Sequence, residues 1–506
     1  MTSTTSVRLG ISGAAQNACA ALSIDGDIRA ACEQERVTRA RGVGLEPASL
    51  PVEAVEQVLA LSGCRPQDVT TYVVAERNVD LPAGLTTERI DHHYAHAATA
   101  FLTSPFQHAA VIVCDSHSDA QVSVWFGEGT HLEDQQWPWR GCGFARLYSE
   151  CAALFDGSPR GREHRLEALA HLGQGTSVEQ LRSMFQYVDG SLRADSRWRG
   201  QLDEMVRSEW RRSQPAETAS AVQRRIGELL LEFIADVRAV AGTDALCLGG
   251  GLFFNTYFTT LIRRSGIFRD VFVPLNPGNA GLAVGISRIT ADEDRDASAG
   301  PAVSPFLGPE FDAEAIKGAL DGCKLSYSFV TQSEAIDAAV GALSRGQLVG
   351  WFQGRMEWGP RALGHRSILA DPRSPYVLDN LNVFLRKRDR SRAFGVSVCE
   401  DAVDQYFCGP PASSFMEYEY GLRDERLRPV MPDGATSIRV QTIGPDQGMF
   451  RALHRRMEQS TGTGVLVNTS LNGFNEPLAC SPRDAIRVFY GTGLDLLVIG
   501  QFVLRK

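Results

Sequence analysis

Two histidines at a helical spacing are the first candidates for chemistry in this sequence. His92 and His96 are four residues apart, so on a helix both imidazoles project from one face. Asp115 follows an apolar stretch, and imidazole together with carboxylate is the ligand set of iron, manganese or zinc sites with open positions. Because two histidines at this spacing are also common on polar surfaces, the pattern leaves a metal site and an ordinary surface both open.

A denser set of basic residues lies in the second half of the chain. The segment 354–367 places three arginines among glycines and a proline, and guanidinium groups on a small-residue backbone suit phosphate, carboxylate or carbamate. The segment 386–392 adds further basic residues. It fits a solvated helix face, an RNA patch or an anion pocket, and its neighbours favour the pocket.

Residues that typically bind ligands also follow two apolar strands. Gly249–Gly251 precedes Asn255 and a helical segment, an arrangement in which backbone N–H groups approach phosphate. A tight structural turn explains the same glycines equally well. The strand 465–467 ends in Asn468–Asn472, and α/β ligand sites lie at such strand ends. An Asx or Ser/Thr turn is the alternative there.

The elements that must position these residues indicate an internally duplicated α/β fold. A strand at 7–12 is followed by an apolar run at 18–24 and a returning strand at 28–32, and a second strand-turn-hairpin unit begins at 109–114. Chance similarity is the alternative, because such units are common. Apolar residues at helical spacing over 218–240 predict a helix with one buried stripe.

Length and composition limit the architecture and the partners. A chain of 506 residues predicts two or three domains, and the small polar segment 291–302 predicts a linker between domains at 1–300 and 304–506. The net charge of -9 argues against a nucleic-acid partner. Eleven cysteines without a C-x-x-C pair, no signal-peptide pattern and no apolar run of spanning length predict a cytoplasmic protein without a membrane partner.

Taken together, these segments resemble the ATP-dependent O-carbamoyltransferases of antibiotic tailoring and nodulation-factor synthesis. The resemblance covers nearly the whole chain and rests on a combination of motifs: Gly10–Gly13, Glu35–Arg39, the His92/His96 segment, 248–255, 354–372, Asn468–Asn472 and Glu476-Pro477. It implies an N-terminal duplicated actin-like ATPase (ASKHA) domain, similar to the tRNA threonylcarbamoyl-transfer protein. A C-terminal YrdC-like α/β domain would follow.

The resemblance also implies an activity. Carbamoyl phosphate and ATP, with Mg²⁺, would form carbamoyl-adenylate in the C-terminal domain with loss of pyrophosphate. A second divalent metal, Fe or Zn, would then polarise the carbamoyl group for attack by a hydroxyl or amine of a small secondary metabolite while AMP leaves. A homodimer is left open.

The resemblance assigns roles to individual residues. The implied metal ligands are His92, His96, Asp115 and Asn279, and the implied catalytic residues are His92, Asp115 and Arg41. The residues implied to hold ATP and carbamoyl phosphate are Gly249, Gly250, Gly251, Asn255, Arg361, Arg366, Arg386, Arg392, Asn468 and Ser470.

Five positions depart from the family pattern. Asn17 and Asn279 stand where the family has aspartate, and Arg41, Arg165 and Arg386 stand where it has lysine. An asparagine removes a charged ligand or base, whereas arginine keeps the charge of lysine but changes its geometry. Three hypotheses follow: carbamoyl transfer, another ATP-dependent acyl transfer or condensation, and a catalytically degenerate partner protein.

Overall fold

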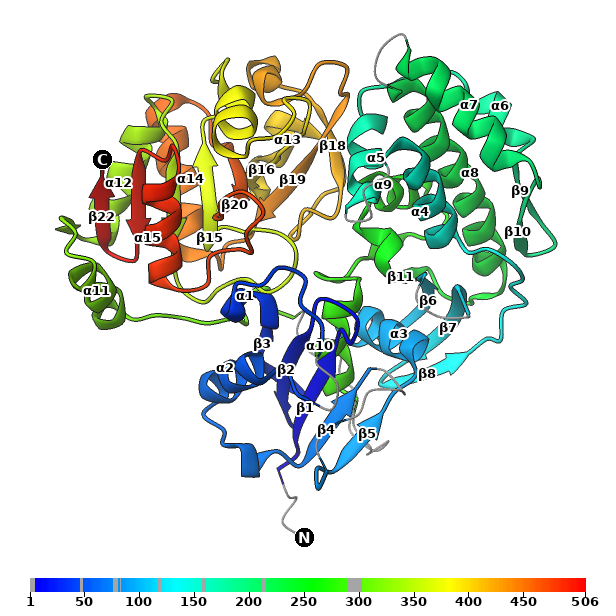
Figure 1. Ribbon diagram of the computed structural model, residues 1–506, viewed down its shortest axis with the longest axis horizontal. Helices are drawn as coiled ribbons and strands as arrows, with labels where there is room; N and C mark the ends of the chain where they lie inside the picture. Colours follow the sequence, from blue (N-terminus) through cyan, green and yellow to red (C-terminus); the bar gives the residue numbers. More distant parts are fainter. Residues whose placement is uncertain are drawn as a thin grey trace.

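The computed structural model describes residues 5–45, 49–75, 81, 83–116, 120–156, 161–211, 215–289 and 303–506. Its strands form two five-stranded sheets, a small hairpin and one ten-stranded sheet, with helices around them (Figure 1). The α/β class predicted from the sequence is therefore confirmed. The predicted linker 291–302 lies outside the described residues, so the domain boundary stays a prediction.

The first sheet is built by a hairpin and two parallel strands. Its order is β3-β2-β1-β4-β5, with bounds β1 (Val7–Ser12), β2 (Cys19–Ile24), β3 (Asp27–Glu33), β4 (Thr71–Val74) and β5 (Thr87–Arg89). Asp25 and Gly26 both have positive φ, which suits the tight turn between β2 and β3. The helices α1 (Gln34–Thr38) and α2 (Val52–Ser62) follow, and α2 packs on β2 and β3.

The second sheet repeats this plan. Its bounds are β6 (His108–Cys114), β7 (Val122–Glu128), β8 (His131–Asp134), β11 (Ala245–Gly249) and β12 (Asp270–Phe272). Read from β8, the strand order is β8-β7-β6-β11-β12. The strands β8, β7 and β6 pair antiparallel, and β11 and β12 then run parallel to β6. The first sheet has the same pattern. The internal duplication predicted from the sequence is therefore confirmed.

The two sheets exchange their last helices. The helix α3 (His92–Leu102) follows the first sheet but packs on β6 and β11 of the second. Conversely, α10 (Leu282–Ser287) follows the second sheet and packs on β1 and β2 of the first, while α3 and α10 pack on each other. This exchange carries His92 and His96 from the first unit to the end of β6 in the second.

A helical lobe separates β8 from β11. It consists of α4 (Phe144–Phe155), α5 (Arg162–Ala170), α6 (Val178–Arg182), the hairpin β9 (Phe185–Val188) and β10 (Ser191–Ala194), α7 (Trp198–Trp210) and α8 (Ala216–Val240). The predicted stripe of α8 is confirmed, since Ile226, Phe233 and Val237 are all fully buried. After β11 comes α9 (Thr256–Ser265). No helix of the described ranges combines the length and apolar composition needed to cross a membrane.

The C-terminal domain is built on the ten-stranded sheet, in the order β13-β22-β21-β14-β15-β20-β16-β19-β18-β17. The strand bounds are β13 (Ser328–Phe329), β14 (Val349–Phe352), β15 (Arg366–Ala370), β16 (Gly395–Cys399), β17 (Phe407–Cys408), β18 (Glu419–Leu422), β19 (Ser437–Ile443), β20 (Leu466–Ser470), β21 (Leu496–Ile499) and β22 (Phe502–Arg505). The helix bounds are α11 (Ala313–Gly322), α12 (Gln332–Leu343), α13 (Val403–Tyr406), α14 (Gly448–Thr461) and α15 (Pro482–Gly491).

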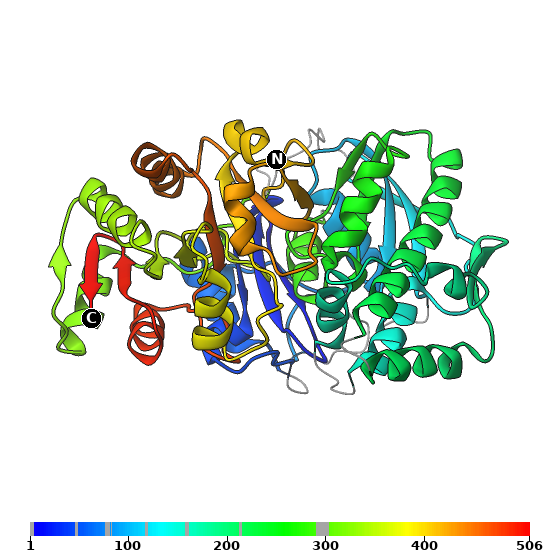
Figure 2. The same ribbon diagram turned by 90° about the horizontal axis from the view of Figure 1, so that it is seen from above.

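Two hydrophobic cores lie on opposite faces of this sheet. The helices α12 and α14 pack on one face, and α11 and α15 contribute to the core on the other. Viewed from above, the C-terminal sheet and the helical lobe lie at the two ends of the molecule with the first sheet between them (Figure 2).

Polar contacts join the first unit to the C-terminal domain. Arg36 donates to the carbonyl of Gly359, and Glu33 accepts from the N–H of the same glycine. Arg39 donates to the carbonyls of Pro477 and Leu478. These contacts hold the glycine-rich loop after β14 against the first sheet.

Candidate functional site

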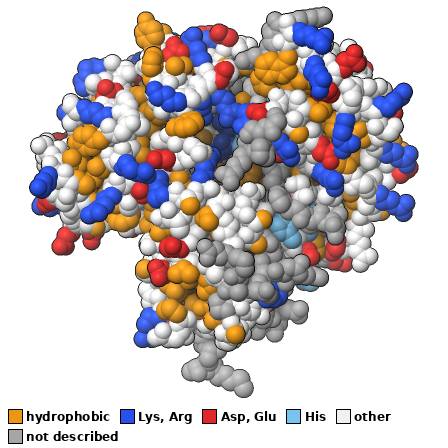
Figure 3. All heavy atoms as spheres, in the orientation of Figure 1, with side chains coloured by type: hydrophobic (Ala, Val, Ile, Leu, Met, Phe, Trp, Pro, Cys, Tyr) orange, Lys and Arg blue, Asp and Glu red, His pale blue; other side chains and the backbone are white. Residues whose placement is uncertain are grey.

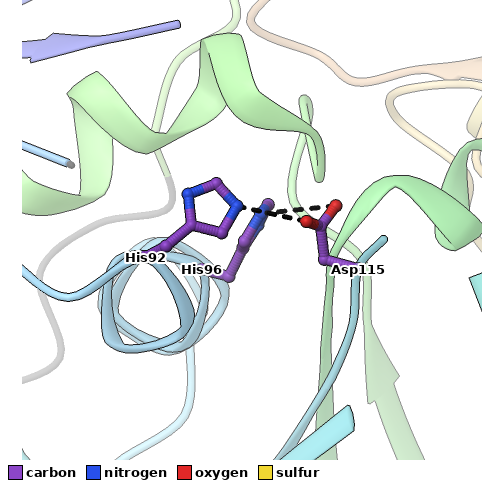
Figure 4. A group of neighbouring side chains, drawn as sticks. All are labelled: His92, His96 and Asp115. Atoms are coloured by element: carbon purple, nitrogen blue, oxygen red, sulfur yellow. Dashed lines mark hydrogen bonds and ion pairs between the residues drawn. The ribbon is translucent and has the colours of Figure 1, made fainter. Parts of the chain in front are cut away.

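His92, His96 and Asp115 converge on one point at the end of β6. Asp91 begins α3 by accepting from the N–H groups of His93 and Tyr94, which sets the first turn. Both imidazoles then project towards the Asp115 carboxylate (Figure 4). The His92 Nε2 lies 3.1 Å from one carboxylate oxygen and the His96 Nε2 lies 3.9 Å from the other. The structure therefore brings three of the four predicted metal ligands together.

The glycines after β11 let the backbone pack closely around this group. A Cβ on Gly250, which has a φ of 105°, would lie 2.1 Å from the carbonyl oxygen of Cys114. A Cβ on Gly249 would lie 3.0 Å from the carbonyl oxygen of His96, and one on Gly251 would lie 3.8 Å from an Asp115 carboxylate oxygen. The structural-turn interpretation thus accounts for Gly250, and a nucleotide contact of Gly249–Gly251 stays a prediction.

The chemistry of the group fits a metal ion. His96 is fully buried, and burial lowers its pKa to about 3, so the imidazole is neutral and keeps a free lone pair. Within the described residues, neither ring nitrogen of His96 makes a well-formed hydrogen bond. A buried nitrogen of this kind, directed at a carboxylate, is what a bound cation would satisfy. The neighbouring His93 turns away and its Nδ1 lies 2.7 Å from the Ser123 hydroxyl.

Asn279 lies in a turn that borders the His92/His96/Asp115 group, which we call the metal group. The Gly250 N–H donates to the carbonyl of Pro277, and the helical turn Asn279–Gly281 follows directly. Asn279 is half-buried. Its role as a fourth ligand stays a prediction, because these contacts locate the turn but do not show where the Asn279 side-chain amide points. Asn17, the other departure of this type, adopts a positive φ of 59°, which asparagine tolerates.

The amino end of α9 is occupied by protein groups. Asn255 caps the helix by accepting from the N–H of Tyr257, and its amide nitrogen donates to Tyr148 and Gln223. The N–H of Thr256 donates to a Glu167 carboxylate oxygen at 3.1 Å. The Asn255 side chain therefore has a structural role here, because both of its polar atoms have protein partners, and its predicted contact with a nucleotide stays a prediction.

Five arginines of the C-terminal domain form a cluster of like charge: Arg361, Arg386, Arg388, Arg392 and Arg439. Burial, reinforced by the neighbouring guanidinium groups, lowers the pKa of Arg361 and Arg388 to about 9. Among the described residues, no carboxylate lies within ion-pair distance of any of the five, whereas Arg390 in the same segment pairs with Asp379. Basic side chains gather in the hollow between the C-terminal domain and the helical lobe (Figure 3).

Hydrogen bonds tie this cluster to the end of β20. Arg386 donates to the carbonyl of Asn472 at 2.7 Å and contacts Ser470, whose hydroxyl donates to the Asn472 side chain. The Asn468 side-chain amide donates to Gln441, and the Oδ1 of the same side chain is buried with no hydrogen bond to the described residues. The structure therefore places Arg386 beside β20, the central strand that carries the predicted residues Asn468 and Ser470.

Comparison with known proteins identifies the family. The model described as "Carbamoyltransferase N-terminus" matches residues 83–287, and "Carbamoyltransferase C-terminus" matches residues 340–506. The chain belongs to the carbamoyltransferase family. It is an enzyme of the transferase class.

Relatives of this carbamoyltransferase include three curated proteins. An uncharacterized protein of Synechocystis is 27% identical over 98% of this chain and 96% of its own length. The nodulation protein NolNO of Sinorhizobium fredii is 25% identical over 96% of this chain and 78% of its own length. A 3'-hydroxymethylcephem-O-carbamoyltransferase of Amycolatopsis lactamdurans is 31% identical over 54% of this chain and 52% of its own length.

Solved structures similar to this carbamoyltransferase share little sequence with it. Full-length HypF in the phosphate- and nucleotide-bound form has a TM-score of 0.39 and 12% identity, over 59% of this chain and 56% of that one. The activator of the 2-hydroxyisocaproyl-CoA dehydratase from Clostridium difficile has a TM-score of 0.36 and 13% identity, over 56% and 93%.

Arg366 of this carbamoyltransferase has a structural role in this conformation, and its predicted phosphate contact stays a prediction. Its side chain is fully buried, and its guanidinium lies 3.6 Å from the ring centre of Phe352. It donates to four main-chain carbonyls, those of Pro309, Gln353, Gly354 and His365. An anion would have to displace these acceptors, so Arg366 holds the loop together in this conformation.

Glu357 is a loop-organising residue that sequence reasoning missed. One oxygen of this fully buried carboxylate accepts from three main-chain N–H groups, those of Leu363, His365 and Arg366. The loop that carries Arg361 is thereby wrapped around one carboxylate. The sequence did contain a signal for this role, namely a single glutamate within the arginine-containing segment 354–367. A buried carboxylate needs hydrogen-bond or charge partners, and this segment offers them.

The remaining predicted residues form their polar contacts with parts of the protein other than the metal group. Arg41 is exposed and donates to Asn475 at 3.2 Å, in the loop that follows β20. Arg165 forms an ion pair with Asp156. Arg392 donates to the carbonyl of His164 in α5, which links the arginine cluster to the helical lobe. A catalytic role of Arg41 stays a prediction.

Proposed function

We propose that this carbamoyltransferase uses carbamoyl phosphate and ATP to carbamoylate a hydroxyl or amine of a small-molecule acceptor, with the chemistry divided between two sites. The observation that carries the proposal is the presence, in one chain, of an arginine cluster with no carboxylate at ion-pair distance among the described residues and of a His/His/Asp group. The first suits substrates with several phosphates, and the second suits a metal that activates a carbonyl.

The arginine cluster is proposed to form carbamoyl-adenylate. Arg361, Arg388, Arg392 and Arg439 would bind carbamoyl phosphate and the triphosphate of ATP, with Mg²⁺ bound to the nucleotide. In total, carbamoyl phosphate, water and ATP give carbamoyl-adenylate, phosphate and pyrophosphate. The cluster favours this reaction because guanidinium groups with no carboxylate at ion-pair distance, as seen for its five arginines among the described residues, gain most from phosphate charge.

The His/His/Asp group is proposed to carry out the transfer. When bound there, a divalent metal such as Fe or Zn supplies Lewis-acid polarisation of a carbonyl group. His92, His96 and Asp115 would hold it, since the Nε2 atoms of both imidazoles face the Asp115 carboxylate. His96 is closed off from solvent, whereas the half-buried His92 leaves one side of the group open to an acceptor.

A reaction with ATP, Mg²⁺ and carbamoyl phosphate tests the proposal. We expect pyrophosphate release that depends on carbamoyl phosphate, and carbamoyl-adenylate detectable by mass spectrometry. Pyrophosphate release that ignores carbamoyl phosphate would favour the alternative of a different acyl transfer. A protein that releases no pyrophosphate under any of these conditions would instead be the degenerate partner of the third hypothesis.

A further inference from the structure

Three titratable side chains meet between the helical lobe and the C-terminal domain. Glu167 lies in α5 and His171 follows the end of the same helix, four residues later. Glu419 begins β18 on the opposite side. One ligand atom from each of the three lies within 4.8 Å of the others. We call Glu167, His171 and Glu419 the cross-lobe group.

The spacing of the cross-lobe group matches that of metal ligands. The His171 Nε2 lies 3.2 Å from a Glu419 carboxylate oxygen. Around a tetrahedral zinc ion, with bonds of about 2.0–2.1 Å to nitrogen and oxygen, adjacent ligand atoms are roughly 3.3 Å apart. Glu167 and His171 also have the i, i+4 relation that puts two ligands on one side of a helix.

The two carboxylates of this group approach each other at one shared hydroxyl. Glu167 and Glu419 are 4% and 3% exposed, so water satisfies little of either. The Thr256 hydroxyl oxygen lies 3.2 Å from a Glu167 oxygen and 2.7 Å from a Glu419 oxygen. Because the hydroxyl has a single proton, it can donate to only one of the two. Two buried carboxylates this close together favour a positive charge between them, which either a charged His171 or a metal ion can supply.

Hydrogen bonds from outside the group fix the two carboxylates. The Thr256 N–H donates to Glu167 at 3.1 Å, and the Ser437 hydroxyl donates to the second oxygen of Glu419 at 2.7 Å. Metal sites are built with such outer hydrogen bonds, which orient the ligands before the ion binds. Only His171, whose side chain is 18% exposed, leaves a path to solvent.

We propose that Glu167, His171 and Glu419 form a second divalent-metal site, of the kind that binds zinc, which joins the helical lobe to the C-terminal domain. It is separate from the His92/His96/Asp115 group and does not depend on the carbamoyl chemistry. One imidazole and two carboxylates suit Zn²⁺ better than Mg²⁺, because imidazole binds hard cations poorly. The ion would act structurally, as a clamp between two parts that otherwise meet through hydrogen bonds.

A proton is the competing occupant of this site. Burial opposes a charged imidazole, but the Glu419 carboxylate outweighs it and raises the pKa of His171. Against the effect of burial, a hydrogen bond from His164, together with the nearby Arg439 guanidinium, holds the pKa of Glu167 well below its usual range. Metal binding must displace the proton from His171, so the ion should bind less tightly as the pH falls.

Zinc stoichiometry tests the proposal on the full chain. Protein stripped with a chelator is dialysed against buffered micromolar Zn²⁺, and the bound metal is measured by elemental analysis. We expect two equivalents for the wild type, one for His171→Gln, one for Glu419→Gln and one for His96→Ala. His131→Gln is the matched control: this exposed histidine of β8 belongs to neither group, so the variant should keep two equivalents.

The melting temperature provides a second measurement, made in a background that has lost the His92/His96/Asp115 site. In His96→Ala, Zn²⁺ should raise the melting temperature, because the remaining site binds only the folded protein. Adding His171→Gln to that background should remove the shift. Equal zinc contents for wild type and His171→Gln would overturn the proposal. If instead the His92/His96/Asp115 group binds nothing, the wild type holds one equivalent that His171→Gln removes and His96→Ala keeps.

Discussion

The metal group and the arginine cluster use burial in opposite ways. Burial lowers the pKa of His96 to about 3, which removes its charge and leaves a lone pair available. Burial also lowers the pKa of Arg361 to about 9, yet a group with that value is still charged at neutral pH. The same desolvation therefore produces a neutral ligand in one region and a concentrated positive potential in the other.

The two regions also differ in how they are assembled. The metal group comes from one helix and one strand end, and its imidazoles are four residues apart. The arginine cluster joins the loop after β14, the segment that follows β15 and the strand β19. A site built from close-lying residues can be recognised from spacing, whereas one built from separate segments depends on the packing of the whole domain.

The largest effect should come from His96→Ala. Loss of this imidazole should empty the metal group and reduce carbamoyl transfer to background, while carbamoyl-adenylate formation at the arginine cluster continues. Metal content, adenylate formation and transfer are measured on the same preparation. His93→Asn is the matched control, since His93 lies in the same helix but contacts Ser123. Loss of adenylate formation in His96→Ala would show that the two regions are not independent.

Arg366→Ala should mainly destabilise the protein. Four main-chain carbonyls would lose their donor and a cavity would form over Phe352, so we expect the free energy of unfolding to fall by about 3–5 kcal/mol. Urea denaturation measures it, and Arg366→Lys, which keeps the charge but not the fork, should lose less. Wild-type stability with lost pyrophosphate release would instead support the prediction that Arg366 binds phosphate.

Arg361→Ala should have a moderate effect on the first half-reaction only. Loss of one charged hydrogen bond to phosphate, at about 1.5–3 kcal/mol, corresponds to a roughly 10- to 100-fold decrease in pyrophosphate release. Arg390→Ala is the control, because this exposed arginine already pairs with Asp379. An equal decrease in both variants would mean that overall basic charge, and not the cluster, binds the substrates.

The smallest effect should come from Asn279→Asp. A carboxylate donates more charge to a cation than an amide carbonyl does, so metal occupancy should rise by a few-fold if Asn279 is a ligand. Turnover should be preserved or increase if the protein is a working carbamoyltransferase, and should fall if the asparagine serves another chemistry. Metal content and transfer rate are measured together. A wild-type site as fully occupied as that of the Asn279→Asp variant would refute a limiting role for this position.

The sequence by itself determined the features that depend on local spacing. The hairpin of residues 18–32, the buried stripe of α8 and the shared face of His92 and His96 all follow from residues a few positions apart. The duplicated units could also be predicted, because each repeats the same local strand-and-turn pattern. Local backbone preferences and apolar periodicity encode these features directly.

Only the tertiary structure decided how the polar residues are used. An arginine in a glycine-rich loop has the same sequence signature whether it faces a hollow, as the half-buried Arg361 can, or is buried among carbonyls, as Arg366 is. Asn255 follows the same rule, since its partners Tyr148 and Gln223 come from α4 and α8. Burial and partner choice arise from contacts between distant segments, and these contacts also set the charge that each side chain carries.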